Sequence, residues 1–346
     1  MQNFQTSKFM FGRFIAAAGI YACFAGFLFL PHFKHFNKLQ YFQPINICLG
    51  CLGCYLLSRR WVGSFIGSLF AGAVYGFGPY MLGLIQFHPL ATLLAAAIPW
   101  LFCPAALMQN RRWHWLSVFL STLPFVAIVL FFKATEHMRL YPIPISAKVH
   151  ISDLVGLLAP LVMTGRSAAL VGFYHVPVAL LIMGISLLLA AQRKGIILII
   201  VLGIAFALCA HQLKLFMEVS PVIWLTIPVL CCSVLIGEGM QGLALAGHSD
   251  RKWILAIIIS MGVLTIVTLL LATKYLYVFA GLGKGAARLL TDTAKLYLLG
   301  ALAVSVIFCM LHSQKRLAYL RWVILCSAMA VDIFLGARFI IDKIIL

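Results

Sequence analysis

Side chains that could do acid–base chemistry and side chains that could bind an anion occur together in one stretch of this chain. The 346 residues include eight Asp and Glu, ten His and 26 Lys and Arg. Carboxylates and imidazoles can exchange a proton with a reacting hydroxyl, whereas Lys and Arg pair with phosphate and carboxylate oxygens. Residues 134–168 contain both kinds of group: Glu136, Arg139, Lys148, Asp153 and Arg166. Whether these side chains can meet one another or a ligand depends on the helices and loops that carry them.

The chain as a whole is too apolar for a water-soluble protein. Hydrophobic residues make up 64% of the chain and charged residues 10%, and the mean hydropathy is +1.06. Soluble domains are about half apolar and a quarter charged. A helix needs about 20 apolar residues to cross a hydrocarbon layer of about 30 Å, and the sequence supplies many such runs. We therefore expect an all-α, polytopic transmembrane helical bundle that forms a single integral membrane domain over residues 1–346.

Gly, Pro and charged residues divide the chain into eleven expected spans. The second of these is short for a bilayer. The spans lie near residues 10–30, 44–57, 62–84, 88–108, 113–133, 169–191, 195–211, 220–243, 252–272, 294–312 and 318–340.

Pairs of basic residues in short loops indicate the orientation. The pairs are Arg59-Arg60, Arg111-Arg112, Arg193-Lys194, Arg251-Lys252 and Lys315-Arg316. Because short cytoplasmic loops are enriched in Lys and Arg, these loops and the N-terminus are expected in the cytoplasm. An odd number of spans then puts the C-terminus outside. The formal net charge of +18 is explained by cations that meet lipid headgroups, so we expect the lipid bilayer as partner, not nucleic acid. A bacterial inner membrane is the expected location.

The groups that could do chemistry then fall mostly on the outer side. The acidic ones in or toward the outer half are Glu136, Asp153, Glu218, Asp292, Asp332 and Asp342, and the histidines are His32, His35, His88, His137, His150, His175 and His211. Within the outer segment 134–168, Pro142 and Pro144 prevent a continued helix. The amphipathic stretch Ile151–Thr164 is expected to lie on the membrane surface or to dip into the bundle. Catalysis or ligand binding is therefore expected at the outer face.

Two carboxylates, Glu238 and Asp332, stand apart in or near apolar spans. A carboxylate in the hydrocarbon zone costs at least about 2.5 kcal/mol and usually faces a partner or a polar cavity. Each could contact a proton or a substrate. Each could instead form a structural pair, Asp332 with Arg338 or with a neighbouring helix, and Glu238 with the Arg251-Lys252 loop. For Glu238 the structural pair is favoured, whereas for Asp332 the two interpretations are balanced.

Two motifs have the spacing of cofactor sites, but neither predicts a cofactor. Cys48, Cys51 and Cys54 match part of an iron–sulfur run, but the final Cys-Pro of that run is missing. Gly237 to Gly242 has the Gly-x-Gly-x-x-Gly spacing of a dinucleotide site, but it ends an apolar helix and follows no strand. For residues 48–54 we predict helix packing, because small residues three positions apart share one face of a helix and allow close packing. No metal site is predicted, and the cofactor, if any, is unknown.

The segment from residue 44 to 107 carries a family resemblance. Its motifs are Pro44-Ile45-Asn46, Tyr55-Leu56-Leu57-Ser58-Arg59-Arg60, Ala71-Gly72-Ala73-Val74-Tyr75-Gly76-Phe77-Gly78-Pro79-Tyr80, Phe87-His88-Pro89 and Ile98-Pro99-Trp100. Together they resemble the early helices of YfhO-type proteins in the GT-C superfamily. Those proteins are integral membrane glycosyltransferases, or their relatives, which use lipid-linked sugar donors on the non-cytoplasmic face.

GT-C enzymes usually carry a catalytic acid in the first outer loop, but here that loop, Pro31 to Pro44, contains no Asp or Glu. Asp153 and Glu136 are then the candidates, because they lie on the same side of the membrane. Whether the chain is a glycosyltransferase or a non-catalytic relative stays open.

The resemblance implies roles for the outer residues. Arg139, Lys148 and Arg166 would hold the phosphate of a polyprenyl-phosphate-linked sugar. His88, in a very short outer turn, is a further substrate-binding candidate. Either of the two outer carboxylates would act as the base on an acceptor hydroxyl.

Two other classes of function stay open. One is a transporter or flippase of an organic anion or lipid, in which Asp332, His175 and the outer basic residues line a pathway. The other is a structural subunit whose strips of small residues dock other membrane proteins. The sequence names no substrate, oligomeric state or protein partner.

Overall fold

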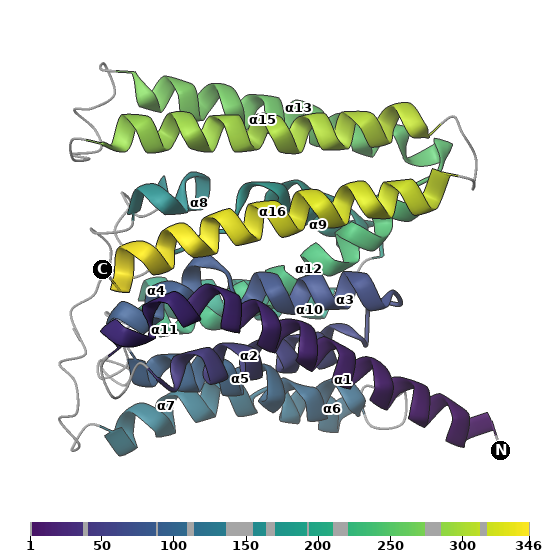
Figure 1. The fold of residues 1–346 in the computed structure, drawn as a ribbon. Coiled ribbons are helices and arrows are strands. Elements are labelled where there is room, and N and C mark those ends of the chain that lie inside the picture. Colours follow the sequence, from purple (N-terminus) through teal and green to yellow (C-terminus); the bar gives the residue numbers. More distant parts are fainter. Residues whose placement is uncertain are drawn as a thin grey trace.

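Helices are the regular structure of the described part of the chain. The computed structural model describes residues 2–36, 41–87, 89–108, 114–135, 155–163, 170–191, 194–209, 221–273, 285–311 and 317–345. Within these ranges all regular elements are α- or 3-10 helices, and no strand occurs. The long helices run side by side, with the N- and C-termini at opposite ends of the bundle (Figure 1). The all-α prediction is confirmed.

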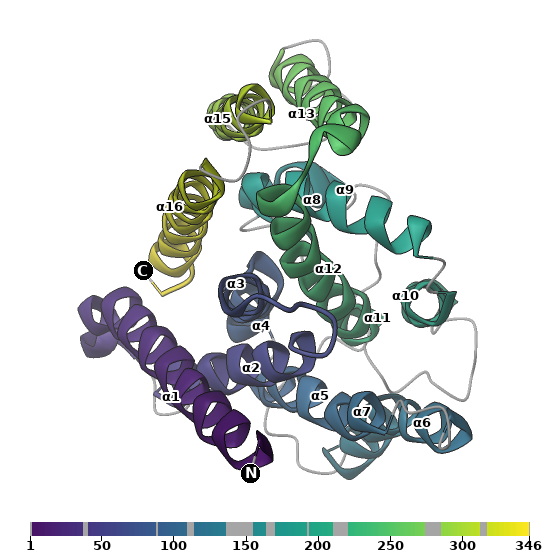
Figure 2. The ribbon, with the colours of Figure 1, turned by 90° about the vertical axis from the view of Figure 1, so that its right-hand side faces the viewer.

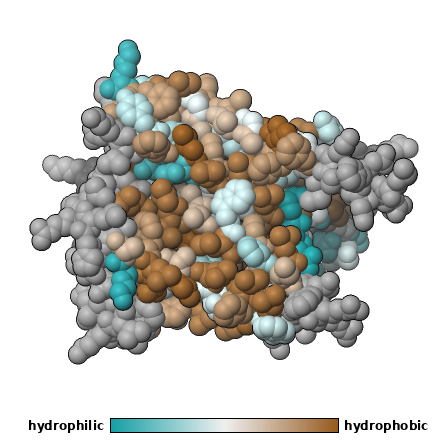
Figure 3. Space-filling model, turned by 90° about the horizontal axis from the view of Figure 1, so that it is seen from below, coloured by the Kyte–Doolittle hydropathy of each residue, from teal (hydrophilic) through white to brown (hydrophobic). Residues whose placement is uncertain are grey.

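Eight helical stretches in the described residues are long and apolar enough to cross a membrane. They are Phe11–Lys34, Phe65–Ile85, Leu90–Leu107, Trp115–Ala134, Val222–Leu245, His248–Ala272, Ala287–Met310 and Tyr319–Lys343. Three shorter apolar helices are Gln43–Ser58, His175–Ala190 and Gly195–Cys209. Figure 3 shows a broad belt of apolar side chains across the middle of one face, with scattered polar side chains among them. The chain is thus a multi-pass membrane protein, while the count of eleven spans and the orientation stay predictions.

The bounds of the helices are close to the expected ones at most positions. They are α1 (Gln2–Phe29), η1 (Leu30–His35), α2 (Gln43–Ser58), α3 (Phe65–Gly76), α4 (Pro79–Phe87), α5 (Pro89–Leu107), α6 (His114–Leu120), α7 (Leu123–Thr135), α8 (Val155–Leu158), η5 (Pro160–Met163), α9 (His175–Ala190), α10 (Lys194–Cys209), α11 (Pro221–Trp224), α12 (Thr226–Leu245), η7 (His248–Asp250), α13 (Arg251–Ala272), α15 (Ala286–Met310) and α16 (Ala318–Ile345).

The buried centre of the bundle is formed where α12 packs against α3 and α9. Seen from one end, α3 and α12 occupy the middle, α1, α2 and α5 lie on one side, and the hairpin of α13 and α15 lies on the other (Figure 2). The Gly237–Gly242 motif is part of this packing, because a side chain at Gly237 would meet the Gly67 carbonyl of α3 and one at Gly239 the Leu180 carbonyl of α9. The motif therefore serves helix contact, a role that the sequence analysis does not predict.

Two expected helices are interrupted. The span expected at 62–84 is divided into α3 and α4 at Phe77 and Gly78. Pro79 is the cause, because it disfavours the α conformation at the preceding residue and has no N–H to donate. The span expected at 113–133 is likewise divided into α6 and α7 at Ser121 and Thr122. Their hydroxyls donate to the carbonyls of Val118 and Phe119 and so compete with the helical pattern.

Three helix starts differ from prediction by six residues or more. The helix expected at 10–30 begins at Gln2. The helix expected at 169–191 begins at His175, because Gly172 has φ +150° and breaks the backbone direction before it. The helix expected at 294–312 begins at Ala286, eight residues earlier. Its first turns contain good helix formers, and Leu290 is buried with Ala159 and Val162. Tertiary contact therefore extends α15 into the segment expected to be an outer connector.

Candidate functional site

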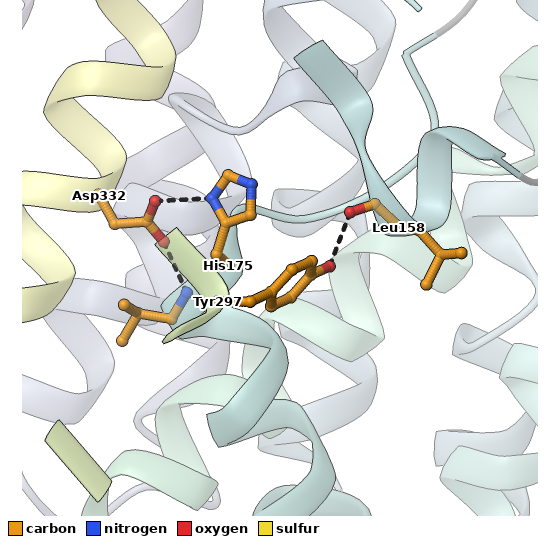
Figure 4. Close-up of polar contacts among 5 residues, drawn as sticks. Leu158, His175, Tyr297 and Asp332 are labelled. Atoms are coloured by element: carbon orange, nitrogen blue, oxygen red, sulfur yellow. Dashed lines mark hydrogen bonds and ion pairs between the residues drawn. The ribbon is translucent and has the colours of Figure 1, made fainter. Parts of the chain in front are cut away.

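A buried aspartate stands near the middle of α16. Asp332 is 1% exposed, and at about 1.5 Å per residue it lies about 20 Å from either end of that helix. One carboxylate oxygen is 3.0 Å from Nδ1 of His175, which is fully buried. The other accepts the backbone N–H of Val176 at 2.6 Å. Figure 4 shows the carboxylate facing the first residues of α9 across the gap between the two helices.

The position of Asp332 is explained by the way α9 begins. The first N–H groups of a helix have no partner within it and carry partial positive charge. Tyr174 occupies the N-cap position of α9, and its side chain makes no capping hydrogen bond. The carboxylate of Asp332 binds the second N–H of the helix, as a capping side chain normally does. A residue of α16 therefore caps α9 from a distance of 156 residues in the chain.

His175 has one ring nitrogen engaged and one open. Because a carboxylate accepts hydrogen bonds, Nδ1 is the nitrogen that donates to Asp332. Nε2 is buried and has no hydrogen-bond partner among the described residues. The ring of Tyr297 packs edge-on against the imidazole, with centroids 4.9 Å apart. The carboxylate thus holds one nitrogen of the imidazole, while the other presents an unused acceptor inside the bundle.

The pair lies where several helices are interrupted. The Tyr174 hydroxyl donates to the carbonyl of Phe77, at the break between α3 and α4. Just beyond that break, the hydroxyl of Tyr80 contacts the carbonyl of Val222 and the hydroxyl of Thr226, on the two sides of the α11–α12 junction. Tyrosine hydroxyls therefore satisfy backbone groups that the breaks leave open, as required of irregular backbone at membrane depth.

A short two-helix element lies against the pair. The hydroxyl of Tyr297 donates to the carbonyl of Leu158, at the end of α8, at 2.8 Å (Figure 4). Ala159, Leu161 and Val162, which follow, are buried, and η5 contacts both α15 and α16. The Tyr297 side chain thus touches the histidine with its ring and the α8–η5 element with its hydroxyl.

A second histidine–aspartate pair lies at one end of the bundle. His32 Nε2 is 2.9 Å from Asp342 of α16, whose carboxylate is 42% exposed. Arg338 lies 3.7 Å from the same carboxylate. Arg338 is therefore beside Asp342, and the partner of Asp332 is the neighbouring helix α9. The two aspartates of α16 make the same type of pair in two different environments.

Of the other sequence-predicted site residues, the structure describes Glu238. Glu238 is half-buried in α12, and Arg251, near which it was expected, lies 5.0 Å above the ring of Phe308. The catalytic candidates Asp153 and Glu136 and the substrate-binding candidates Arg139, Lys148, Arg166 and His88 lie outside the described residues. The contacts described above therefore form the candidate site.

No cofactor site is evident in the part of the chain that the structure describes. No group of three or more His, Cys, Asp or Glu there could hold a metal ion. All ten cysteines are free, and Cys51 and Cys54 are buried against neighbouring helices. The Sγ of Cys54 lies 3.5 Å from the Ala71 carbonyl, which agrees with the packing role predicted for this motif.

Sequence reasoning missed Tyr297 and Tyr174. Both are single tyrosines in apolar surroundings, where nothing in the local pattern separates a structural hydroxyl from a functional one. The succession Tyr174-His175 shortly before Pro177 was the available signal, because a proline in a first helical turn marks a helix start. A helix start within an apolar run implies open N–H groups that some side chain must satisfy.

Comparison with protein families, curated proteins and solved structures finds no match to this chain. The chemistry of the buried pair is accordingly the basis on which a function can be assigned.

Proposed function

We propose that this protein is a proton-coupled membrane transporter of an organic anion or lipid, and that His175 and Asp332 carry the proton. The observation that supports this is the burial of an ionisable pair at mid-depth in the bundle. Ionisable groups in membrane-spanning segments are costly and usually mark ion pathways or proton relays. The transporter hypothesis assigns these two residues to a pathway, and their hydrogen bond to each other supports a shared role.

Proton transfer would act through the double role of Asp332. As a carboxylate it accepts hydrogen bonds from His175 and from the N–H of Val176. Protonation removes the negative charge that stabilises the start of α9 and weakens both contacts. The fit of α16 against α9 would then depend on the proton. A ligand or proton shifts a conformational equilibrium only by binding the two states differently, and this pair provides such a difference.

The interrupted helices also support a transport function. In many secondary transporters the substrate and ion sites lie near the midplane, at helices whose ends point into the bundle. Here α9 begins beside Asp332, and Tyr174 links that start to the break between α3 and α4. Movement of α9 relative to α16 would therefore be transmitted to the break.

Access to the pair requires a change from the structure described above, because both side chains are sealed. The α8–η5 element is the part that would move. It is bound to the Tyr297 hydroxyl through Leu158, and releasing this hydrogen bond would uncover the edge of the tyrosine beside His175. The structure corresponds in this proposal to an occluded state.

The test is transport by the purified full chain in liposomes. A panel of organic anions and fluorescent phospholipids would be offered with and without an imposed pH gradient. We expect gradient-driven movement of one class, its loss in Asp332→Asn, and its retention in Asp342→Asn, which alters the exposed pair on the same helix. Equal transport by wild type and Asp332→Asn would overturn the role of the pair.

The glycosyltransferase-like function is the second proposal, favoured by one observation. The described elements between Asp153 and Arg166 in sequence, α8 and η5, pack against the bundle. In this case Asp153→Asn or Glu136→Gln should abolish sugar transfer from a polyprenyl-phosphate donor. Unchanged product from both variants would remove the catalytic assignment.

A further inference from the structure

A basic groove opens at the end of the bundle that carries the N-terminus, and its described lining residues include no member of either histidine–aspartate pair. It has a volume of about 300 Å³ and lies between α1, α2 and α5, which are side by side in the end view (Figure 2). Small-molecule sites start at about this size. The chemistry of its wall indicates what could bind there.

Three guanidinium groups from two elements line one end of the groove. They belong to Arg13 of α1 and to Arg59 and Arg60 at the end of α2. Arg59 is half-buried, and its Nη1 donates to the carbonyl of Gly63 at 2.9 Å, which fixes the position of the side chain. The described residues that line the groove include no Asp or Glu. This end of the groove therefore carries an excess of positive charge.

The rest of the wall is apolar. Leu56 and Leu57 of α2 and Cys103, Ala106 and Leu107 of α5 line it. Leu107 is 80% exposed and lies in the apolar stretch Leu90–Leu107. The groove thus continues from a cluster of cations into the hydrocarbon-facing surface. A ligand that satisfies both parts has an anionic head and an apolar tail.

We propose that this groove is a binding site for an anionic phospholipid. The headgroup phosphate pairs with Arg13, Arg59 and Arg60, because guanidinium groups bind phosphate oxygens with paired hydrogen bonds. One acyl chain lies along the apolar wall formed by α2 and α5. Basic pockets between transmembrane helices at the membrane surface are suited to such headgroups. The lipid also holds α1 against α2, since its phosphate contacts arginines from both.

The test is lipid binding by the full chain in detergent, measured by native mass spectrometry as phosphatidylglycerol is titrated. The variant Arg13→Gln/Arg60→Gln removes two cations and leaves Arg59 in place. Each basic residue near an anionic lipid contributes enough that losing two should weaken binding about 30-fold. The matched control is Lys34→Gln/Arg288→Gln, which removes two exposed cations elsewhere on the protein. We expect the control to bind like wild type.

A further variant separates charge from shape. Cys103→Trp fills the apolar wall without changing any charge, and it should weaken phosphatidylglycerol binding while leaving the three arginines intact. The proposal is overturned if the control loses as much affinity as the double variant, or if phosphatidylcholine with the same acyl chains binds as tightly. It is also overturned if inorganic phosphate alone displaces the lipid, or if Cys103→Trp binds like wild type.

Discussion

At the scale of single residues, Asp332 combines two structural tasks. It is the partner of a buried histidine and the cap of a helix that has no cap of its own. An uncompensated buried polar group costs far more than an exposed one. The sequence could indicate that Asp332 needs a partner, but the partner itself could not be found because His175 lies 157 positions away.

Asp332→Leu should destabilise the protein strongly. It removes the partner of His175 and leaves the Val176 N–H open, and breaking a buried pair costs about 3–5 kcal/mol. Asp342→Leu removes a half-exposed partner of His32 and should cost about 1 kcal/mol or less. Reversible unfolding in detergent compares the two free energies. Equal losses would show that burial does not decide the strength of these pairs.

Arg321 is a second buried charged residue with a structural explanation. It is 5% exposed, and its guanidinium donates to the carbonyls of Ala246 and Met310 at 2.8 and 2.7 Å. Those carbonyls lie at the ends of α12 and α15, where cations are favourable.

Arg321→Gln should lower the free energy of unfolding by about 2–4 kcal/mol, because two charge-assisted hydrogen bonds are lost. Arg338→Gln, which changes an exposed arginine beside Asp342, is the control and should cost under about 1 kcal/mol. Thermal or chemical unfolding measures both. A small effect at Arg321 would mean that the ends of α12 and α15 are held by other contacts.

At the scale of elements, most helices follow from hydrophobic run length, but their interruptions follow from contacts. The sequence predicts α2 and α13 nearly to their ends, because charged or polar residues border each apolar run. It places the start of α9 six residues too early and joins α3 to α4, because an apolar run does not show where the backbone turns. Gly78-Pro79 was a usable local signal. The capping of α9 by α16 was not, because it is a tertiary contact.

The packing of α16 on the start of α9 depends on a glycine. A side-chain carbon at Gly336 would meet the ring of Tyr174, so Gly336→Ala should force the helices apart and cost about 1–3 kcal/mol. Gly262→Ala in α13 meets nothing within 4 Å and should be neutral or stabilising, since alanine is the better helix former. Unfolding experiments on both variants test this. A neutral Gly336→Ala would contradict the close contact of α16 with Tyr174.

At the scale of the whole molecule, composition predicts that the chain spans a membrane several times. The eight long apolar helices and the belt in Figure 3 agree with the mean hydropathy. Contacts also group residues by end: His32 pairs with Asp342 at one end, and Arg13 shares a groove with Arg59 and Arg60 at the other. The sequence predicts that the members of each group lie on the same side of the membrane. Which residues become neighbours on that side depends on the packing order of the helices.

The topology prediction can be tested with reporters at the two ends of the chain. If the N-terminus is cytoplasmic and the number of spans is odd, the C-terminus is outside. A fluorescent protein that folds only in the cytoplasm should be active at the N-terminus and inactive at the C-terminus. Alkaline phosphatase should show the reverse. Two reporters active on the same side would exclude an odd number of spans.

The most direct test of the central claim is infrared difference spectroscopy of the protein in liposomes during a pH titration. If His175 and Asp332 exchange a proton with the medium, a carboxylic-acid band of Asp332 should appear as the pH falls. That band should be absent in Asp332→Asn and present in Asp342→Asn. If wild type shows no band that depends on Asp332 throughout the pH range in which the protein stays folded, the pair is a structural clamp and the proton-coupled proposal is wrong.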